Sequence, residues 1–280
     1  MRALRGHSLQ RPWGRLRVWT AGSGPVVLAV HGLGGSGRYF DGLASRAGDG
    51  LTVVAPDLGG FGHSDKPELD YDRPFHLENL DAVVEEAAPG GRVVVVGHSL
   101  GGVLAALWTA RRPERVAALA LVAAPFPAID RGMPPASRRT HDADRRRRRR
   151  LAYRAVQAAW PAITLPVRSR TFPRAVISDY LRHTLPSYWG TASAVLWDPS
   201  TEAELAGLAG WPGSPALILT APDDRSVATA DGDRWAALLP RAERRSVAGG
   251  HQLLLRTRFA ALLPWLDGLP LRARETRPPQ

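Results

Sequence analysis

Short apolar runs rich in valine, leucine and alanine alternate with stretches of helical length along the first half of the chain. Four such runs, each of strand length, cover residues 25–30, 51–55, 92–96 and 116–123. Strands this apolar are typical of a sheet that is buried on both faces. Parallel neighbours in such a sheet are joined by crossover helices. The alternation therefore predicts an α/β fold with a mostly parallel sheet and helices on both faces.

Further segments extend this pattern. We expect helices at residues 75–88, 100–111, 231–239 and 253–266, and strands at residues 15–20, 216–220 and 244–247. The first of these strands precedes a Gly- and Ser-rich turn, and we expect it to be an antiparallel edge strand that leads into the sheet. Thr201 and Glu204 have the spacing of a capping box, which predicts the start of one more short helix.

The alternation breaks between residues 125 and 200, where prolines are frequent and no clear strand is present. The aromatic residues of this segment are more than a disordered linker carries: Trp160, Tyr180, Tyr188, Trp189 and Trp197. We therefore expect a small helical cap at residues 127–199, inserted into a core made by residues 1–126 and 200–270. Residues 271–280 are predicted to form a polar, frayed tail.

The formal net charge is +11, and nearly all of the basic residues are arginines. Lys66 is the only lysine, and residues 145–150 are all arginine, with Arg138 and Arg139 just before them. A block of like charges is usually a solvated segment, and no aromatic residue interrupts this one to stack on bases. We therefore expect no nucleic-acid partner, and an anionic substrate is the alternative reason for the run.

Absent residues and motifs exclude several kinds of chemistry. The chain has no cysteine, which rules out disulfides, thiolate metal sites and a cysteine nucleophile. No HExxH or P-loop motif suggests a metal or an organic cofactor. No apolar run reaches the roughly 18 residues of a membrane helix, and residues 1–10 hold no signal-peptide core. We expect a soluble, cytoplasmic monomer or homodimer without metal, cofactor or membrane span.

The pentapeptide Gly97-His98-Ser99-Leu100-Gly101 directly follows one predicted strand and precedes a predicted helix. A nucleophile elbow requires this strand, turn and helix, with glycines that let the backbone come close. The N-terminus of the following helix directs free amides and a positive dipole end at the serine. A chance match in a chain with 28 glycines is the alternative, which this context disfavours. Ser99 is therefore the predicted nucleophile.

Together with four further matches in order, from residue 27 to about residue 266, this motif resembles the α/β-hydrolase superfamily. The segment His31-Gly32-Leu33-Gly34-Gly35-Ser36 resembles the family's oxyanion-hole loop. The resemblance implies that the backbone amides of Leu33 and Leu100 bind the oxyanion, while His31 only supports the loop. Residues 56–67 resemble the turn after the next strand, in which Asp57, His63 and Asp65 are expected to be structural.

A serine hydroxyl needs a base to take its proton and a carboxylate to orient that base. His251, after Ala248-Gly249-Gly250, resembles the family's triad histidine. The competing histidines lie in the N-terminal stretch, in turns, at a helix start, in the elbow or in the cap. Asp224 matches the acid in register, with Asp223 as the alternative. Ala221 stands where the family often has glycine. The order Ser99, Asp224, His251 is the order of this fold.

Serine at the elbow implies, through this resemblance, the hydrolysis of a carboxylic ester by way of an acyl-enzyme on Ser99. An aspartate there would suggest epoxide or haloalkane chemistry. We expect a small or medium, largely apolar acyl substrate in a cleft lined by Trp160, Trp189 and Trp197, although each of them can equally pack within the cap. A thioesterase, a non-hydrolytic lyase or synthase, and a non-catalytic ligand-binding protein on this fold are the alternatives.

Overall fold

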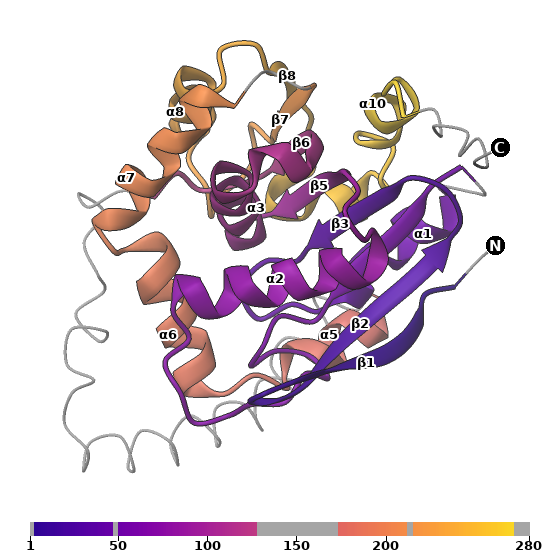
Figure 1. Ribbon diagram of the computed structural model, residues 1–280. Coiled ribbons are helices and arrows are strands. Elements are labelled where there is room, and N and C mark those ends of the chain that lie inside the picture. The colour runs from indigo at the N-terminus through magenta and orange to yellow at the C-terminus, as the bar shows by residue number, and fades with distance from the viewer. Residues whose placement is uncertain (1–2, 47–49, 128–172, 212–214, 272–280) are drawn as a thin grey trace, which may run out of the picture.

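A single eight-stranded sheet organises the computed structural model, which describes residues 3–46, 50–127, 173–211 and 215–271 (Figure 1). The strand order is β1-β2-β4-β3-β5-β6-β7-β8. The strands are β1 Arg5–Arg11, β2 Gly14–Gly22, β3 Val26–Val30, β4 Thr52–Pro56, β5 Val93–His98, β6 Val116–Val122, β7 Ala216–Thr220 and β8 Glu243–Ser246. Only β2 pairs antiparallel, with β1 and β4; all other neighbours are parallel. The predicted mostly parallel sheet is confirmed.

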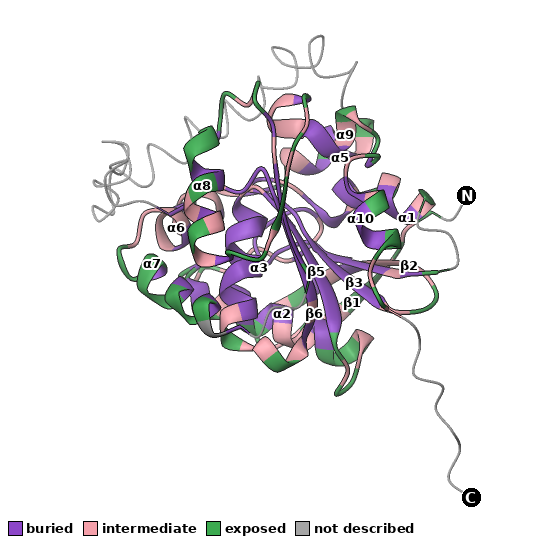
Figure 2. Ribbon diagram, turned by 90° about the horizontal axis from the view of Figure 1, so that it is seen from above, coloured by how far each residue is buried: buried purple, intermediate pink, exposed green. Residues whose placement is uncertain are grey.

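Helices cover both faces of this sheet (Figure 2). The α-helices are α1 Asp41–Arg46, α2 Arg73–Ala87, α3 Leu100–Arg111, α5 Arg174–Tyr180, α6 Leu185–Leu196, α7 Ser200–Leu205, α8 Thr229–Leu238, α9 Leu253–Arg256 and α10 Leu263–Asp267. Short 3-10 helices are η1 Gly37–Phe40, η2 Pro113–Arg115, η4 Ala206–Gly210 and η5 Gly250–Gln252. None of the described helices is long and apolar enough to cross a membrane.

Strand β3 shows why the central strands are apolar throughout. Val26, Leu28 and Val30 belong to one core cluster, which also holds residues of α2, α3 and α8. Val27 and Ala29 belong to a second cluster, which holds residues of α1, α9 and α10. Successive side chains of a strand point to opposite faces, so a strand buried on both sides has no polar position.

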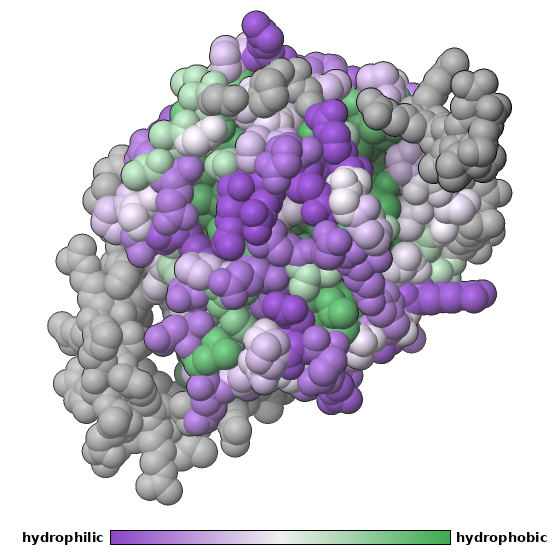
Figure 3. Space-filling model, viewed as in Figure 1, coloured by the Kyte–Doolittle hydropathy of each residue, from purple (hydrophilic) through white to green (hydrophobic). Residues whose placement is uncertain are grey.

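Helix α2 has the one-sided pattern of a surface helix. Leu77, Leu80 and Val84 are buried against the sheet, whereas Glu78 and Glu85 are exposed. Its outer face lies at the front of the molecule in Figure 1, and Figure 3 shows that this side is mostly hydrophilic, with only small apolar patches.

One strand was missed, and two expectations about elements were wrong. Residues 5–11 form strand β1, which the sequence analysis missed because an edge strand with polar residues lacks an apolar run. Strand β2 is therefore antiparallel, as expected, but it is not the edge of the sheet. The single helix expected at residues 253–266 is broken into α9 and α10, because Arg258 and Phe259 adopt positive φ angles of 50° and 65°.

The predicted capping box of Thr201 and Glu204 is also absent. Helix α7 begins at Ser200, and no side chain caps its N-terminus. Both residues instead bind Arg73 of α2: the guanidinium donates to the Thr201 hydroxyl over 3.0 Å and to a Glu204 carboxylate oxygen over 2.7 Å. The Thr201 hydroxyl and the Glu204 carboxylate therefore bind a distant arginine rather than the backbone amides that a capping box would use.

The described part of the predicted insertion, residues 173–199, is helical and contains α5 and α6. A capping box of Thr184 and Ser187 opens α6. His76 of α2 bonds to Thr191 of α6 over 2.9 Å, which ties the insertion to the core. Trp160, the arginines at positions 138, 139 and 145–150, and residues 272–280 of the predicted tail lie outside the described residues. The domain boundaries stay predictions.

The elbow between β5 and α3 depends on glycines that leave no room for a side chain. A Cβ on Gly101 would lie 2.3 Å from the carbonyl oxygen of Val30, and a Cβ on Gly97 would lie 2.3 Å from the carbonyl oxygen of Gly101. Contacts this short exclude any larger residue unless the backbone moves. The glycines therefore let α3 start directly against β3 and β5.

We predict that Gly101→Ala lowers the free energy of unfolding by about 1–3 kcal/mol, because the added methyl group overpacks the elbow. Gly91→Ala is the control: its Cβ would meet nothing closer than 3.5 Å, so we expect a change within about 1 kcal/mol. Urea unfolding of both variants measures the difference. Equal stabilities would contradict the steric argument.

Four buried histidines, His31, His76, His98 and His183, make the fold sensitive to acid, because burial lowers the pKa of each. Burial lowers the pKa of His76 and of His98 to about 3, and that of His183 to about 4. Unfolded histidine has a pKa near 6.5, so between about pH 6.5 and pH 4 the unfolded chain binds protons that the folded chain does not. Stability is therefore complete above this range and is lost as the pH falls through it.

We predict that the free energy of unfolding falls between pH 7 and pH 5, by up to about 1.4 kcal/mol per pH unit for each buried histidine. In His76→Gln one of the four protonation steps is missing, so the pH dependence should be shallower than in the wild type. Urea unfolding at pH 7, 6 and 5 measures the slope. A free energy that does not change over this range would rule the prediction out.

Candidate active site

Ser99 lies at the carboxyl end of the central strand β5, in the turn that leads into α3. Its backbone has φ 55° and ψ −129°, a strained conformation for a residue with a side chain. The Ser99 amide donates to the carbonyl of Val122 over 2.9 Å, and the Gly102 amide donates to the Ser99 carbonyl over 2.8 Å. These bonds hold the turn, and the Ser99 side chain is left half-buried.

Three side chains from distant parts of the chain meet at this turn. His251 Nε2 lies 2.9 Å from Ser99 Oγ, and His251 Nδ1 lies 2.9 Å from an Asp224 carboxylate oxygen. A carboxylate can only accept, so Nδ1 carries the proton and Nε2 is free to accept from the serine hydroxyl. The structure thus brings together the three residues expected from the sequence, with the histidine in the form of a base toward Ser99.

Asp224 is held as an anion. Its side chain is 3% exposed, and the amides of Ser226 and Val227 donate to it over 2.7 and 3.1 Å. Burial acts to raise the pKa of Asp224, but the hydrogen bonds from His251 and the two amides hold the pKa below its usual value. The carboxylate therefore stays ionised at neutral pH, where it can orient His251.

Asp223, the alternative acid, has a different position. Its carboxylate accepts from the amides of Gly249 and Gly250, over 3.0 and 2.8 Å, and these bonds lower its pKa. Gly249 and Gly250 have φ angles of 153° and 60° and lead directly into His251. Asp223 therefore fastens the loop that carries the histidine, while Asp224 contacts the imidazole.

The loop after β3 lies against Ser99, because a Cβ on Gly32 would be 3.0 Å from the Ser99 Cβ. The buried ring of His31 supports this loop: Nδ1 donates to the Gly32 carbonyl over 2.8 Å, and Nε2 accepts from the Leu58 amide over 3.0 Å. Leu100 is the first residue of α3, so its amide has no partner within the helix. Within the described ranges, no protein acceptor binds the amide of Leu33 or of Leu100. Both amides are free to donate to a ligand.

His98 has a role that the sequence analysis missed. Its Nε2 lies 2.8 Å from the carbonyl oxygen of His251, and its ring stacks on Tyr39 with centroids 4.7 Å apart. Because burial keeps His98 neutral, Nε2 is a proton donor to this carbonyl. The residue before the serine thus holds the backbone of the histidine. No local pattern signals a bond between residues 153 positions apart.

Asp57, expected to be structural, is fully buried. Its carboxylate accepts from the indole of Trp19 over 2.9 Å, from the Gly37 amide over 2.7 Å and from the His63 amide over 2.6 Å. Burial would raise the pKa of Asp57, but the bonds from His63 and the amides hold the pKa low. Asp65 instead pairs with Arg15, over 3.1 Å, at the surface.

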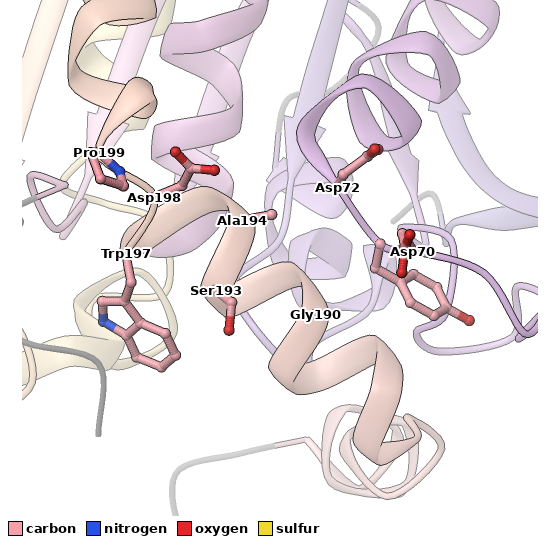
Figure 4. Close-up of a pocket in the computed structure, with 9 residues that line it drawn as sticks. Asp70, Asp72, Gly190, Ser193, Ala194, Trp197, Asp198 and Pro199 are labelled. Atoms are coloured by element: carbon pink, nitrogen blue, oxygen red, sulfur yellow. The ribbon is translucent and has the colours of Figure 1, made fainter. Parts of the chain in front are cut away.

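A groove of about 450 Å³ lies between α6 and the segment before α2 (Figure 4). It is lined by Asp70, Tyr71, Asp72, Gly190, Ser193, Ala194, Trp197, Asp198 and Pro199. Trp189 stacks on Trp197, with ring centroids 5.9 Å apart. Ser99, Asp224 and His251 do not line this groove, so an acyl pocket made by the tryptophans stays a prediction. No group of three or more metal-ligating side chains occurs in the part of the chain that the structure describes.

Parts of this sequence are similar to known proteins. A 2-(acetamidomethylene)succinate hydrolase of Mesorhizobium japonicum is 35% identical over 101 residues, which are 36% of this chain and 36% of that protein. A haloalkane dehalogenase of the same organism is 36% identical over 105 residues, which are 38% of this chain and 34% of that protein. The chain thus spans about a third of the length of these curated relatives.

The fold is shared over a longer range than the sequence. An esterase from Exiguobacterium antarcticum superposes with a TM-score of 0.73 at 19% identity, over 94% of this chain and 100% of the other. The model of the family described as alpha/beta hydrolase fold matches residues 25–256. This chain therefore belongs to the alpha/beta hydrolase fold family.

Proposed function

We propose that this chain is a serine hydrolase that cleaves the carboxylic ester of a small or medium, largely apolar substrate through an acyl-enzyme on Ser99. The observation that carries the proposal is the unbroken hydrogen-bond chain from Ser99 Oγ through His251 to Asp224, with both links at 2.9 Å. The two unbonded amides beside Ser99 support it, because acyl transfer needs donors where negative charge develops.

The geometry supports a two-stage reaction. As Ser99 Oγ attacks the ester carbonyl carbon, its proton passes to His251 Nε2, and the carbonyl oxygen becomes an oxyanion that the amides of Leu33 and Leu100 bind. His251 then gives the proton to the departing alcohol, which leaves an ester on Ser99. A water molecule repeats the sequence with His251 as the base and releases the acid. Asp224 stabilises the imidazolium in both stages.

The relatives bear on the reaction class in two ways. The similarity to a 2-(acetamidomethylene)succinate hydrolase supports hydrolysis. The similarity to a haloalkane dehalogenase leaves dehalogenation to be considered. A carboxylate at the elbow would suit that reaction, and this chain has serine there. Serine paired with a histidine base favours acyl transfer over dehalogenation.

We predict that the protein hydrolyses 4-nitrophenyl butyrate and reacts with a fluorophosphonate probe at Ser99, located by peptide mass spectrometry. Ser99→Ala should abolish the labelling and lower kcat by about 10⁴-fold or more, because no other group can form the acyl-enzyme. Ser45→Ala, which changes a half-buried serine of α1, should keep both. Labelling at another residue, or none in folded wild-type protein, would overturn the proposal.

An ester and a thioester with the same acyl group should be compared, and the ester should have the higher kcat/KM.

The two neighbouring aspartates should differ sharply. Asp224→Asn should lower kcat about 10⁴-fold, because an amide that donates to His251 Nδ1 favours the wrong tautomer. Asp223→Asn keeps an oxygen that accepts from the Gly249 and Gly250 amides, so we expect a loss below about tenfold. Burst kinetics with an activated ester measure the acylation step in both. A larger loss in the Asp223 variant would reverse the assignment.

A further inference from the structure

Helix α5, which comes from the predicted insertion, packs directly on the oxyanion loop. Gly34, next to Leu33, has φ +76°, and a Cβ there would lie 2.6 Å from the ring of Tyr180 at the end of α5. No larger residue fits at Gly34 while the ring stays in place. The residue beside a proposed oxyanion donor is therefore in contact with a helix that does not belong to the predicted core.

Asp179, the residue before Tyr180, binds the same loop through its side chain. Its carboxylate is fully buried and accepts from Ser36 Oγ over 2.6 Å and from Arg38 Nε over 2.7 Å. A second, shorter bond from Arg38 makes the pairing bidentate. Ser36 and Arg38 follow Leu33 by only three and five positions. Bidentate, charge-assisted bonds of this kind fix geometry more strictly than apolar contact does.

The segment from Ser36 to Arg38 is held from both sides. Asp179 binds its two ends from the insertion, and Asp57 binds the Gly37 amide between them from the core, over 2.7 Å. His63 Nδ1 lies 3.4 Å from the Asp57 carboxylate and 3.6 Å from the Asp179 carboxylate. Two buried carboxylates thus enclose one short stretch of backbone.

A buried charge is not needed merely to dock α5. Val176 and Ile177 on the same helix are already buried, and apolar contacts of this kind hold helices without the desolvation penalty of an ion pair. The directional bonds of Asp179 fix the position of α5 relative to the loop, rather than adding to the strength with which the helix is held.

We propose that Asp179 is a positioning residue for the oxyanion hole: through Ser36 and Arg38 it fixes the Leu33 amide against Ser99. The inference rests on the proposed function of Ser99 and goes beyond it, because it gives the insertion a part in the chemical step. A displacement of the amide by about 1 Å is enough to reduce the rate on the order of 100-fold.

The test compares Asp179→Asn and Ser36→Ala with Thr109→Val. The control also removes a buried hydroxyl, which bonds within α3 to the Ala105 carbonyl over 2.8 Å, nine residues and about 14 Å along the helix from Leu100. With 4-nitrophenyl butyrate, the two loop variants should lose about 10- to 100-fold in kcat, with KM within about threefold of wild type. The control should keep kcat within about threefold.

A second measurement isolates the oxyanion hole from general structural damage. A short alkyl trifluoromethyl ketone forms a tetrahedral adduct with an active serine, so its Ki should rise in each variant in proportion to the fall in kcat/KM. The double variant of Ser36→Ala and Asp179→Asn should lose no more than the more severe single variant, because both changes break one connection. Thermal unfolding of all variants identifies any loss that is only structural.

The outcomes separate this inference from the proposed function. If the wild type carries no label on Ser99, the proposed function fails and this inference fails with it. If the wild type is labelled but Ser36→Ala keeps the kcat and the ketone Ki of the Thr109→Val control, only this inference is overturned. If Asp179→Asn does not fold, Ser36→Ala alone decides, since it removes one hydroxyl and leaves the Arg38 pair in place.

Discussion

The close approach of three backbone segments at the elbow is the constraint on which the rest of this structure depends. Strand β3, strand β5 and the first turn of α3 meet where Gly97 and Gly101 have no space for a Cβ. This approach sets the turn in which Ser99 takes its positive φ, and it puts the loop after β3 beside the serine side chain. The base His251, the acid Asp224 and the free amides of Leu33 and Leu100 are all placed around that turn.

Much of the fold could be predicted from local sequence. Central parallel strands are buried on both faces, so β3, β5 and β7 have apolar runs that show their extent within one or two residues. Strand β1 could not be predicted in this way because its polar sequence is determined by its place at the sheet edge. The break at Arg258 and Phe259 was also missed, since neither residue type favours a positive φ and tertiary packing of the buried Phe259 imposes it.

In the candidate site, too, local motifs could be predicted and long-range contacts could not. Ser99, Asp224 and His251 stand in short motifs at strand ends, and the parallel topology brings strand ends together, so sequence could name them. Two hydrogen bonds join residues more than 140 positions apart: the bond from His98 to the His251 backbone and the bond from Ser36 to Asp179. No motif contains them, and only the folded chain places them. The roles expected for Trp189 and Trp197 lacked a motif as well, and these two rings lie by a groove that the triad does not line.

The long interval between Ser99 and His251 has a consequence for the chain while it is being made. Domains made on the ribosome begin to fold from their N-terminal parts, and β3 and β5 with their elbow are complete long before residue 251 leaves the exit tunnel. A nascent chain of this length carries its serine without a base, and the hydroxyl is then no more reactive than that of any other serine. In the proposed mechanism, Ser99 therefore becomes reactive only when β7 and β8 have joined the sheet, and a chain that ends before residue 251 would lack the base.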